Sequence, residues 1–235
     1  MSQFLYKYRP CNEYTKAIFT SGCLHYSHPS DFNDPYDCLL CHDGAEQYVY
    51  STLGMDKRPY LSILKINELL PILQHEIDDI LICCFSKDGL QMQMWSHYAD
   101  YHQGLCLGFD QDLLLSRLHC EMHPVNYKPE QVKFDVTDSN NLTKETIQFL
   151  YTKHYSWAYE KEVRFFHRPE TNCNDNYPFN KQALKSIYFG SRCSNDNIKL
   201  YIDLCRRNGF EHVKFYKIRL SNKGRFELEP EAITN

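Results

Sequence analysis

Two carboxylates and a guanidinium alternate in the C-terminal third of the chain, at Glu160, Glu162 and Arg164. Aromatic and β-branched residues dominate the second half of residues 157–166, which predicts a β-strand. Because side chains alternate across a strand, we expect the three charged residues on one face. Two carboxylates on a buried face repel each other and are costly to dehydrate, so Arg164 is a candidate for the compensating charge. The pattern leaves two interpretations open: an edge strand with a solvated face, or a pair of catalytic carboxylates.

Residues 94–104 are also dense in side chains that do chemistry, with two His, two Tyr, one Trp and one Asp. On a predicted helix over 91–101, His97 and Tyr101 are four residues apart and share a face. A histidine accepts or donates a proton near neutral pH, so His97 is a candidate acid or base. The same composition also fits a helix that buries its aromatic side chains and uses its histidines for structural hydrogen bonds.

Residues 38–42 read Cys-Leu-Leu-Cys-His, the C-x-x-C-H pattern of covalent haem attachment. Such attachment belongs to exported proteins, and the N-terminal residues have no signal-peptide layout. Zinc binding by Cys38, Cys41 and His42 is the alternative, but a structural site needs four ligands and no second C-x-x-C exists. We therefore predict no metal.

A dense turn signal, Phe-Asn-Asp-Pro-Tyr-Asp, occupies residues 32–37. Asn33 and Asp34 are residue types that bond nearby backbone N–H groups. The loop is either a structural turn or the lining of a cleft.

Strand and helix signals mix without a regular βαβ alternation, which predicts one α+β domain over residues 1–235. The expected strands are 6–9, 24–27, 80–86, 104–110, 184–189 and 213–220, and residues 125–134 are expected to be extended. The expected helices are 12–21, 44–80, 91–101, 111–119, 143–154 and 194–207. Asn12 and Ser194 are predicted N-caps, and Gly22 is a predicted helix end.

Composition and charge exclude several classes of protein. The net charge, 26 − 30 = −4, gives no general attraction for nucleic acid. No apolar run is long enough to span a membrane, and we expect a cytoplasmic protein whose eleven cysteines are mostly reduced. The sequence has no G-x-S-x-G, no P-loop and no G-x-G-x-x-G, which disfavours α/β-hydrolases, kinases and Rossmann dehydrogenases.

Five motifs together resemble a bacterial family known mainly as a domain of unknown function, from about residue 5 to about residue 190. They are Leu-Tyr-Lys-Tyr-Arg at 5–9, Phe-Asn-Asp-Pro-Tyr-Asp at 32–37, Trp-Ser-His-Tyr at 95–98, His-Gln-Gly at 102–104 and Tyr-Glu-Lys-Glu-Val-Arg at 159–164.

A more distant resemblance is to the NAD-dependent ADP-ribosyltransferases, whose Glu-x-Glu strand is similar to residues 159–163. In those enzymes an Arg on the first strand and a Ser on a middle strand precede the glutamate pair. Here Arg9 and Ser86 come in that order. The chain departs from the pattern at Ser86, which lacks the usual Ser-Thr-Ser, and at Arg164, where an apolar residue is usual. The resemblance implies a split β-sheet core with flanking helices, and NAD as a substrate.

The resemblance also implies roles for individual residues. Glu162 would hold the ribose hydroxyl and stabilise the oxocarbenium-like cation, and Glu160 would orient or deprotonate the acceptor. Arg9 would bind the phosphates or ribose of the dinucleotide. The other predicted site residues are His97 as an accessory acid or base, and Tyr8, Ser86, Tyr98, Asn33 and Asp34 around the NAD, with Tyr8 or Tyr98 stacked on nicotinamide.

Three functional hypotheses follow. The first is an ADP-ribosyltransferase or NAD-cleaving enzyme of a toxin or phage-defence system, acting on a protein or nucleic-acid acceptor that the sequence does not identify. The second is a non-catalytic module that binds a nucleotide, nucleic acid or protein on the same scaffold. The third is a hydrolase or metal enzyme built on His97, Asp100, His102 and Glu162.

Overall fold

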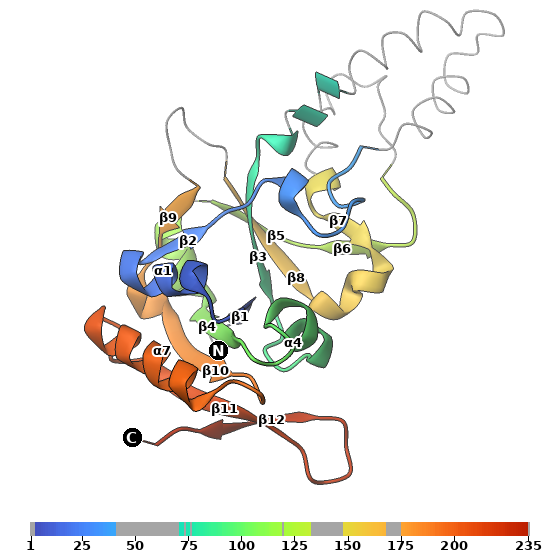
Figure 1. Ribbon diagram of the computed structural model, residues 1–235. Coiled ribbons are helices and arrows are strands. Elements are labelled where there is room, and N and C mark those ends of the chain that lie inside the picture. Colours follow the sequence, from blue (N-terminus) through green and yellow to red (C-terminus); the bar gives the residue numbers. More distant parts are fainter. Residues whose placement is uncertain are drawn as a thin grey trace, which may run out of the picture.

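The computed structural model describes residues 3–40, 71–72, 74–75, 77–118, 120–132, 148–167 and 175–234. A mixed eight-stranded sheet runs through this part of the chain (Figure 1). Its strands, in spatial order, are β12 (Leu228–Ala232), β11 (Lys214–Leu220), β10 (Leu184–Phe189), β4 (Leu105–Asp110), β1 (Phe4–Arg9), β3 (Leu81–Ser86), β8 (Glu162–His167) and β5 (Glu121–Pro124). Only β10 and β11 are parallel neighbours in this sheet. The predicted α+β class is confirmed.

Two small sheets and a few helices complete the described part of the fold. The small sheets pair β2 (Cys23–His25) with β9 (Asn176–Pro178), and β6 (Asn126–Lys128) in parallel with β7 (Thr152–His154). The α-helices that are described over their whole length are α1 (Glu13–Ser21), α4 (Met92–Tyr98), α5 (Gln111–Leu118) and α7 (Asn195–Arg207). Residues 71–72, 74–75, 77–78 and 148–150 are also helical. The 3₁₀ helices are η1 (Pro29–Asp31), η2 (Tyr155–Glu160) and η3 (Lys181–Ala183). No helix in the described ranges is long and apolar enough to cross a membrane.

Hydrophobic packing covers both faces of the large sheet. On one face, apolar strand residues such as Leu107 and Ile187 pack with Phe19 of α1 and Tyr201 of α7, and the two helices lie side by side (Figure 1). On the other face, Trp95 of α4 packs edge-on against Tyr8 at 5.3 Å between ring centroids. Burial from both sides explains why β3 and β4 read as continuous apolar runs.

Helix ends follow the predicted capping residues. The side chain of Asn12 accepts a hydrogen bond from the backbone N–H of Thr15 at 3.0 Å. Gly22 ends α1 in the left-handed conformation, with φ 67°. Ser194 accepts from the backbone N–H of Asn197 at 3.2 Å and starts α7. These three predictions are confirmed.

The predicted strand over 157–166 is only half right. The strand β8 begins at Glu162, whereas Trp157 lies in η2, a 3₁₀ helix that ends at Glu160. Lys161 turns the chain between the two with φ 46°. A non-glycine residue with positive φ breaks the strand alternation, so Glu160 does not share the β8 face with Glu162 and Arg164.

Two predicted helices also differ from the structure. α4 ends at Tyr98, and positive φ angles at the next turn, 51° at Tyr101 among them, prevent His97 and Tyr101 from sharing a helix face. Within the helix expected over 143–154, residues 148–150 are helical but 152–154 form β7. Most of the helix expected over 44–80 lies outside the described residues.

The large sheet opens between β1 and β3. These strands pair at a single position, Tyr6 with Ser86, while β1 pairs along its whole length with β4. Beyond that position β3 forms an isolated bridge from Ile82 to Ser27, and the ammonium of Lys7 donates to the carbonyl of Cys84 at 3.0 Å. The opening leaves room for a cavity beside the centre of the sheet.

Candidate functional site

A cavity of about 460 Å³ lies at the opening between β1 and β3. This volume is within the range of small-molecule pockets in proteins. The cavity brings together eight of the residues predicted for the site, from β1, the 32–37 loop, β3, α4, η2 and β8: Tyr8, Arg9, Asn33, Ser86, His97, Tyr98, Glu160 and Glu162.

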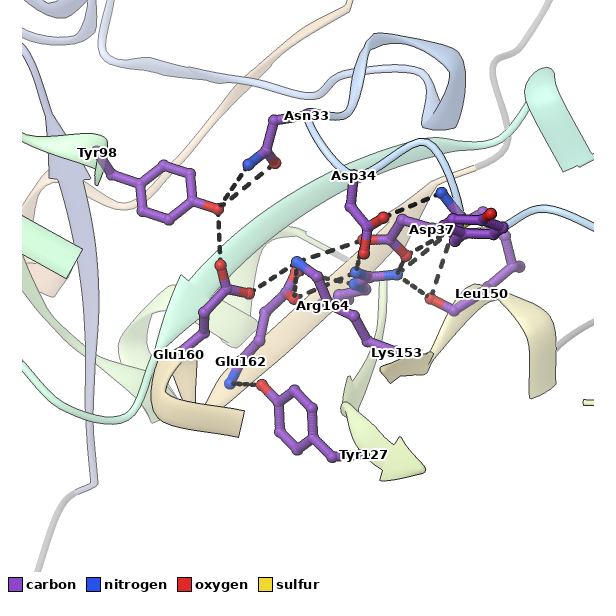
Figure 2. Close-up of polar contacts among 12 residues, drawn as sticks. Asn33, Asp34, Asp37, Tyr98, Tyr127, Leu150, Lys153, Glu160, Glu162 and Arg164 are labelled. Carbon is purple, nitrogen blue, oxygen red and sulfur yellow. Dashed lines mark hydrogen bonds and ion pairs between the residues drawn. The ribbon is translucent and has the colours of Figure 1, made fainter. Parts of the chain in front are cut away.

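Several of the residues that line the cavity belong to a buried cluster of charges, whose contacts are drawn in Figure 2. Arg164, whose side chain is fully buried, donates from Nε and Nη2 to the two carboxylate oxygens of Glu162 at 2.8 and 3.1 Å. Its Nη1 and Nη2 donate to the two oxygens of Asp37 at 2.9 and 2.6 Å. The prediction that Arg164 compensates a carboxylate is confirmed, since this geometry is that of paired bidentate ion pairs.

Lys153 of β7 completes the cluster. Its ammonium lies 2.7 Å from Glu160 Oε2 and 3.4 Å from both Glu162 Oε2 and Asp37 Oδ2. The cluster therefore holds three carboxylates and two cations, and its net charge when fully ionised is −3 + 2 = −1. The side chains are almost entirely buried, so these charges interact through a medium less polar than water.

The cluster displaces the pKa values of the two glutamates in opposite directions. Burial alone raises both, because it disfavours the charged form. At Glu162 the neighbouring Arg164 and Lys153 outweigh burial and lower the pKa to about 2. At Glu160 burial, together with the charge of Glu162, outweighs Lys153 and raises the pKa above its ordinary value. Glu162 therefore stays ionised near neutral pH, whereas Glu160 takes up a proton at a higher pH than an ordinary glutamate.

Tyr98 links Glu160 to the 32–37 loop. Its hydroxyl donates to Glu160 Oε1 at 2.6 Å, and the side-chain amide of Asn33 donates to the Tyr98 hydroxyl at 3.3 Å (Figure 2). Burial, and then the Glu160 carboxylate, raise the pKa of Tyr98, so the phenol stays protonated at neutral pH.

The β1 side of the cavity carries two cations, Lys7 and Arg9. The Lys7 ammonium contacts the Cys84 carbonyl, the Cys83 thiol at 3.3 Å and the Phe85 ring at 5.0 Å from its centroid. Arg9 Nε is buried without a hydrogen-bond partner, and burial lowers the pKa of this guanidinium. No salt bridge joins either cation to a carboxylate within the described ranges.

Three of the predicted residues are engaged in internal contacts. The Ser86 hydroxyl contacts the Glu160 carbonyl at 2.6 Å and the Asp88 carbonyl at 3.1 Å. The Tyr8 hydroxyl donates to the same Asp88 carbonyl at 2.7 Å. Asp34 does not line the cavity, and its carboxylate accepts from the backbone N–H of Tyr36 at 3.0 Å.

The histidines of residues 94–104 lie in different surroundings. His97 is exposed at the cavity, with its ring 6.1 Å from that of Tyr159. His102 lies away from the cavity, stacks on Trp95 at 6.3 Å and contacts the Ser96 hydroxyl at 3.2 Å. Among the residues described, no three His, Cys, Asp or Glu side chains are arranged to hold a metal ion.

The Cys-rich motif is only partly described. Cys41 and His42 lie outside the described residues. The Cys38 thiol receives a hydrogen bond from Arg164 Nη1 at 3.4 Å, and burial raises its pKa. Of the other cysteines, Cys83 and Cys106 are buried in the core, whereas Cys84 is half-buried and lines the cavity.

Sequence reasoning missed four charged residues of the cavity: Lys7, Asp31, Asp37 and Lys153. Asp37 was grouped with the turn residues of its loop, and Lys153 was assigned to a helix. The sequence held one signal: two carboxylates beside one arginine leave a net charge of −1, which a further cation would neutralise. The sequence did not show which residue supplies that cation, because Lys153 and Asp37 are far apart in the chain.

Comparison with protein families finds a match over part of the chain. A family model described as "Protein of unknown function (DUF2971)" matches residues 94–165. The matched stretch runs from α4 into β8 and holds His97, Tyr98, Glu160 and Glu162, while Arg9 and the 32–37 loop precede it. No curated protein and no solved structure matches the chain. Over the acidic side of its cavity, the chain is thus similar to a family of unknown function.

Proposed function

We propose that this chain cleaves the bond between nicotinamide and ribose in NAD, as an ADP-ribosyltransferase or an NAD-cleaving enzyme. The observation that carries the proposal is the charge arrangement of one cavity. Two cations, Lys7 and Arg9, lie on β1 and form no salt bridge in the described part of the chain. The acidic cluster lies at β8, which is separated from β1 by β3.

Such a cavity fits a ligand that carries opposite charges at its two ends. The diphosphate of NAD is anionic and suits the guanidinium of Arg9 and the ammonium of Lys7. The nicotinamide ring of the oxidised cofactor is cationic and suits a cluster with a net charge of −1. The opening of the sheet between β1 and β3 is also what the resemblance to ADP-ribosyltransferases leads us to expect.

The two glutamates divide the chemistry between them. When the glycosidic bond breaks, its electron pair goes to the nicotinamide nitrogen and the ribose becomes an oxocarbenium-like cation. Glu162, held ionised by Arg164, stabilises that cation by charge and transfers no proton. The acceptor nucleophile then bonds to the ribose carbon and passes its proton to Glu160. A pair of carboxylates with pKa values displaced in opposite directions suits these two roles.

Nicotinamide release measures the proposed activity directly. We expect purified protein to release nicotinamide from NAD, and Glu162→Gln to abolish release while the circular dichroism spectrum and the thermal midpoint show a folded protein. Glu229→Gln, an exposed glutamate at the far edge of the sheet, is the matched control and should retain full release. Release by Glu162→Gln at the wild-type rate would overturn the assignment.

Binding provides a second and independent measurement. Oxidised NAD carries a cationic ring and NADH a neutral one, so the acidic cluster should favour the oxidised form. Calorimetry should give a lower Kd for NAD than for NADH, and Glu160→Gln should reduce the difference. Mass spectrometry of a lysate incubated with NAD identifies the acceptor by the mass of the added ADP-ribose.

A non-catalytic binding module is a second candidate. It is favoured by the engagement of Glu162 and Ser86, since both Glu162 oxygens are bound by Arg164 and the Ser86 hydroxyl is used inside the protein. Calorimetry with NAD and with single-stranded oligonucleotides separates the candidates. Tight oligonucleotide binding without nicotinamide release would favour the binding module.

A further inference from the structure

Lys153 connects three carboxylates that come from three segments of the chain. Asp37 belongs to the loop after β2, Glu160 ends η2, and Glu162 begins β8. The side chain of Lys153 is only 4% exposed, and its ammonium lies 4.8 Å from the centre of the Trp157 ring. Burial lowers the pKa of this lysine, but the three carboxylates outweigh it and raise the pKa, so Lys153 is charged.

The two cations of the cluster share Asp37 and Glu162, but differ at Glu160. Arg164 donates to both oxygens of Glu162, to both of Asp37 and to the carbonyl of Leu150. Glu160 receives no hydrogen bond from Arg164 among those observed. Within the described ranges the partners of its carboxylate are the Lys153 ammonium and the Tyr98 hydroxyl (Figure 2). Lys153 is therefore the cation that forms an ion pair with the Glu160 carboxylate.

Removal of Lys153 would change Glu160 more than Glu162. The cluster would go from a net charge of −1 to −2, and Glu162 would keep its bidentate partner Arg164. Glu160 would lose the opposite charge at 2.7 Å while the like charge of Glu162 remains. A carboxylate in that position takes up a proton at a higher pH than before.

We propose that Lys153 is a positioning residue that holds the Glu160 carboxylate at the cavity in its ionised form, ready to accept a proton from the attacking group. This assignment rests on the proposed function, in which Glu160 accepts that proton. Lys153 itself bonds to no ligand in this role and acts through Glu160.

The pH profile of kcat/KM for nicotinamide release tests the role. In Lys153→Met we expect the acid limb of the profile to move to higher pH by about 1 to 3 units, the usual effect of one close opposite charge. Above the new limb the rate should recover. Lys153→Arg should restore the wild-type limb in part, because it returns a cation with a different shape. A residue that serves only the fold would lower the rate at every pH and leave the limb in place.

A matched control and a second neutral variant complete the design. Lys161→Met removes the neighbouring lysine, whose exposed ammonium bonds to Asp88 outside the cluster, and should leave the profile unchanged. Lys153→Gln keeps an N–H donor near Glu160 and replaces Lys153→Met if that variant does not fold.

Carbon-13 titration of Glu160 separates failure of this inference from failure of the proposed function. The Glu160 carboxyl signal is assigned by its absence in Glu160→Gln and followed with pH in wild type and in the neutral Lys153 variant. If the wild type releases no nicotinamide, the proposed function fails and the proton-accepting role of Glu160 fails with it. A shift of the titration to higher pH would then still support Lys153 as the residue that keeps Glu160 ionised. An unchanged titration midpoint would overturn the inference, whatever the activity.

Discussion

Arg164 binds Glu162, two residues before it on β8, through two parallel hydrogen bonds of 2.8 and 3.1 Å. The same guanidinium binds Asp37 through two more. One fully buried cation therefore fixes two carboxylates from distant parts of the chain. This arrangement keeps Glu162 charged inside the protein, where an isolated carboxylate would instead take up a proton.

Loss of the Arg164 charge should destabilise the protein strongly. Arg164→Met leaves Asp37 and Glu162 buried with Lys153 as the remaining cation, and breaking a buried ion pair in this way costs about 3–5 kcal/mol. Urea unfolding measures the loss. Arg219→Gln removes an exposed guanidinium bonded to Glu231 and should cost about 1 kcal/mol or less. Equal losses in the two variants would contradict the buried network.

Acid should weaken the fold through Glu162. Its pKa is about 2 in the folded protein against an ordinary value of 4.5, so its stabilising contribution is fully present above pH 4.5 and is lost as the pH falls towards 2. In Glu162→Gln the free energy of unfolding should depend less steeply on pH in that window. Glu160 has a raised pKa and contributes in the opposite sense and at higher pH: between its raised folded pKa and the ordinary value of 4.5, a fall in pH stabilises the protein, and Glu160→Gln should remove this gain. Unfolding curves collected across both windows would contradict the assignment if both variants followed the wild type.

Replacement of Arg9 should weaken the binding of NAD without lowering the stability of the protein. Its Nε is buried without a partner, a state that costs about 1–3 kcal/mol. Arg9→Met should therefore keep or raise the free energy of unfolding, while the affinity for NAD falls about tenfold or more with the loss of a charged hydrogen bond to phosphate. Calorimetry with nicotinamide, which has no phosphate, is the control and should be unaffected. An unchanged Kd for NAD would exclude Arg9 from the site.

A side chain at position 104 should destabilise the protein, because Gly104 lies against the backbone of Arg9. A Cβ at Gly104 would lie 2.2 Å from the Arg9 carbonyl oxygen and 2.9 Å from that of Ala99. Gly104→Ala forces the backbone at Arg9 to shift, and the free energy of unfolding in urea should fall by about 1–3 kcal/mol. Gly224→Ala meets no atom within 4 Å and carries only the strain of its positive φ, roughly 1 kcal/mol. The site assignment of Arg9 further predicts that Gly104→Ala raises the Kd for NAD.

Local signals in the sequence were sufficient for much of the fold. Asn12, Gly22 and Ser194 mark helix ends through hydrogen bonds and φ angles that depend only on near neighbours. The apolar runs of β3 and β4 report burial on both faces. The strand predicted over 157–166 was wrong in its first half because composition does not reveal the left-handed turn at Lys161.

The sequence predicted which residue types would line the cavity better than it predicted their contacts. The glutamate pair, Arg9 and Tyr98 do line one cavity, and Arg164 does compensate a carboxylate. The ion pairs of Asp37 and Lys153 depend on how the loop after β2 and the strand β7 meet β8, which is a property of the whole fold. No local pattern in a single sequence predicts ion pairs between segments that are so far apart in the chain.

The distance along the chain between Arg164 and Asp37 has a consequence for synthesis. The two residues are 127 positions apart, so Asp37 leaves the ribosome long before its partner exists. Contacts over so long a separation are slow to form, because the entropy of loop closure opposes them. A nascent or prematurely terminated chain that ends before β8 has neither Glu162 nor the arginine that keeps it ionised. Whatever the cavity does to its ligand, it can do only once translation has passed β8.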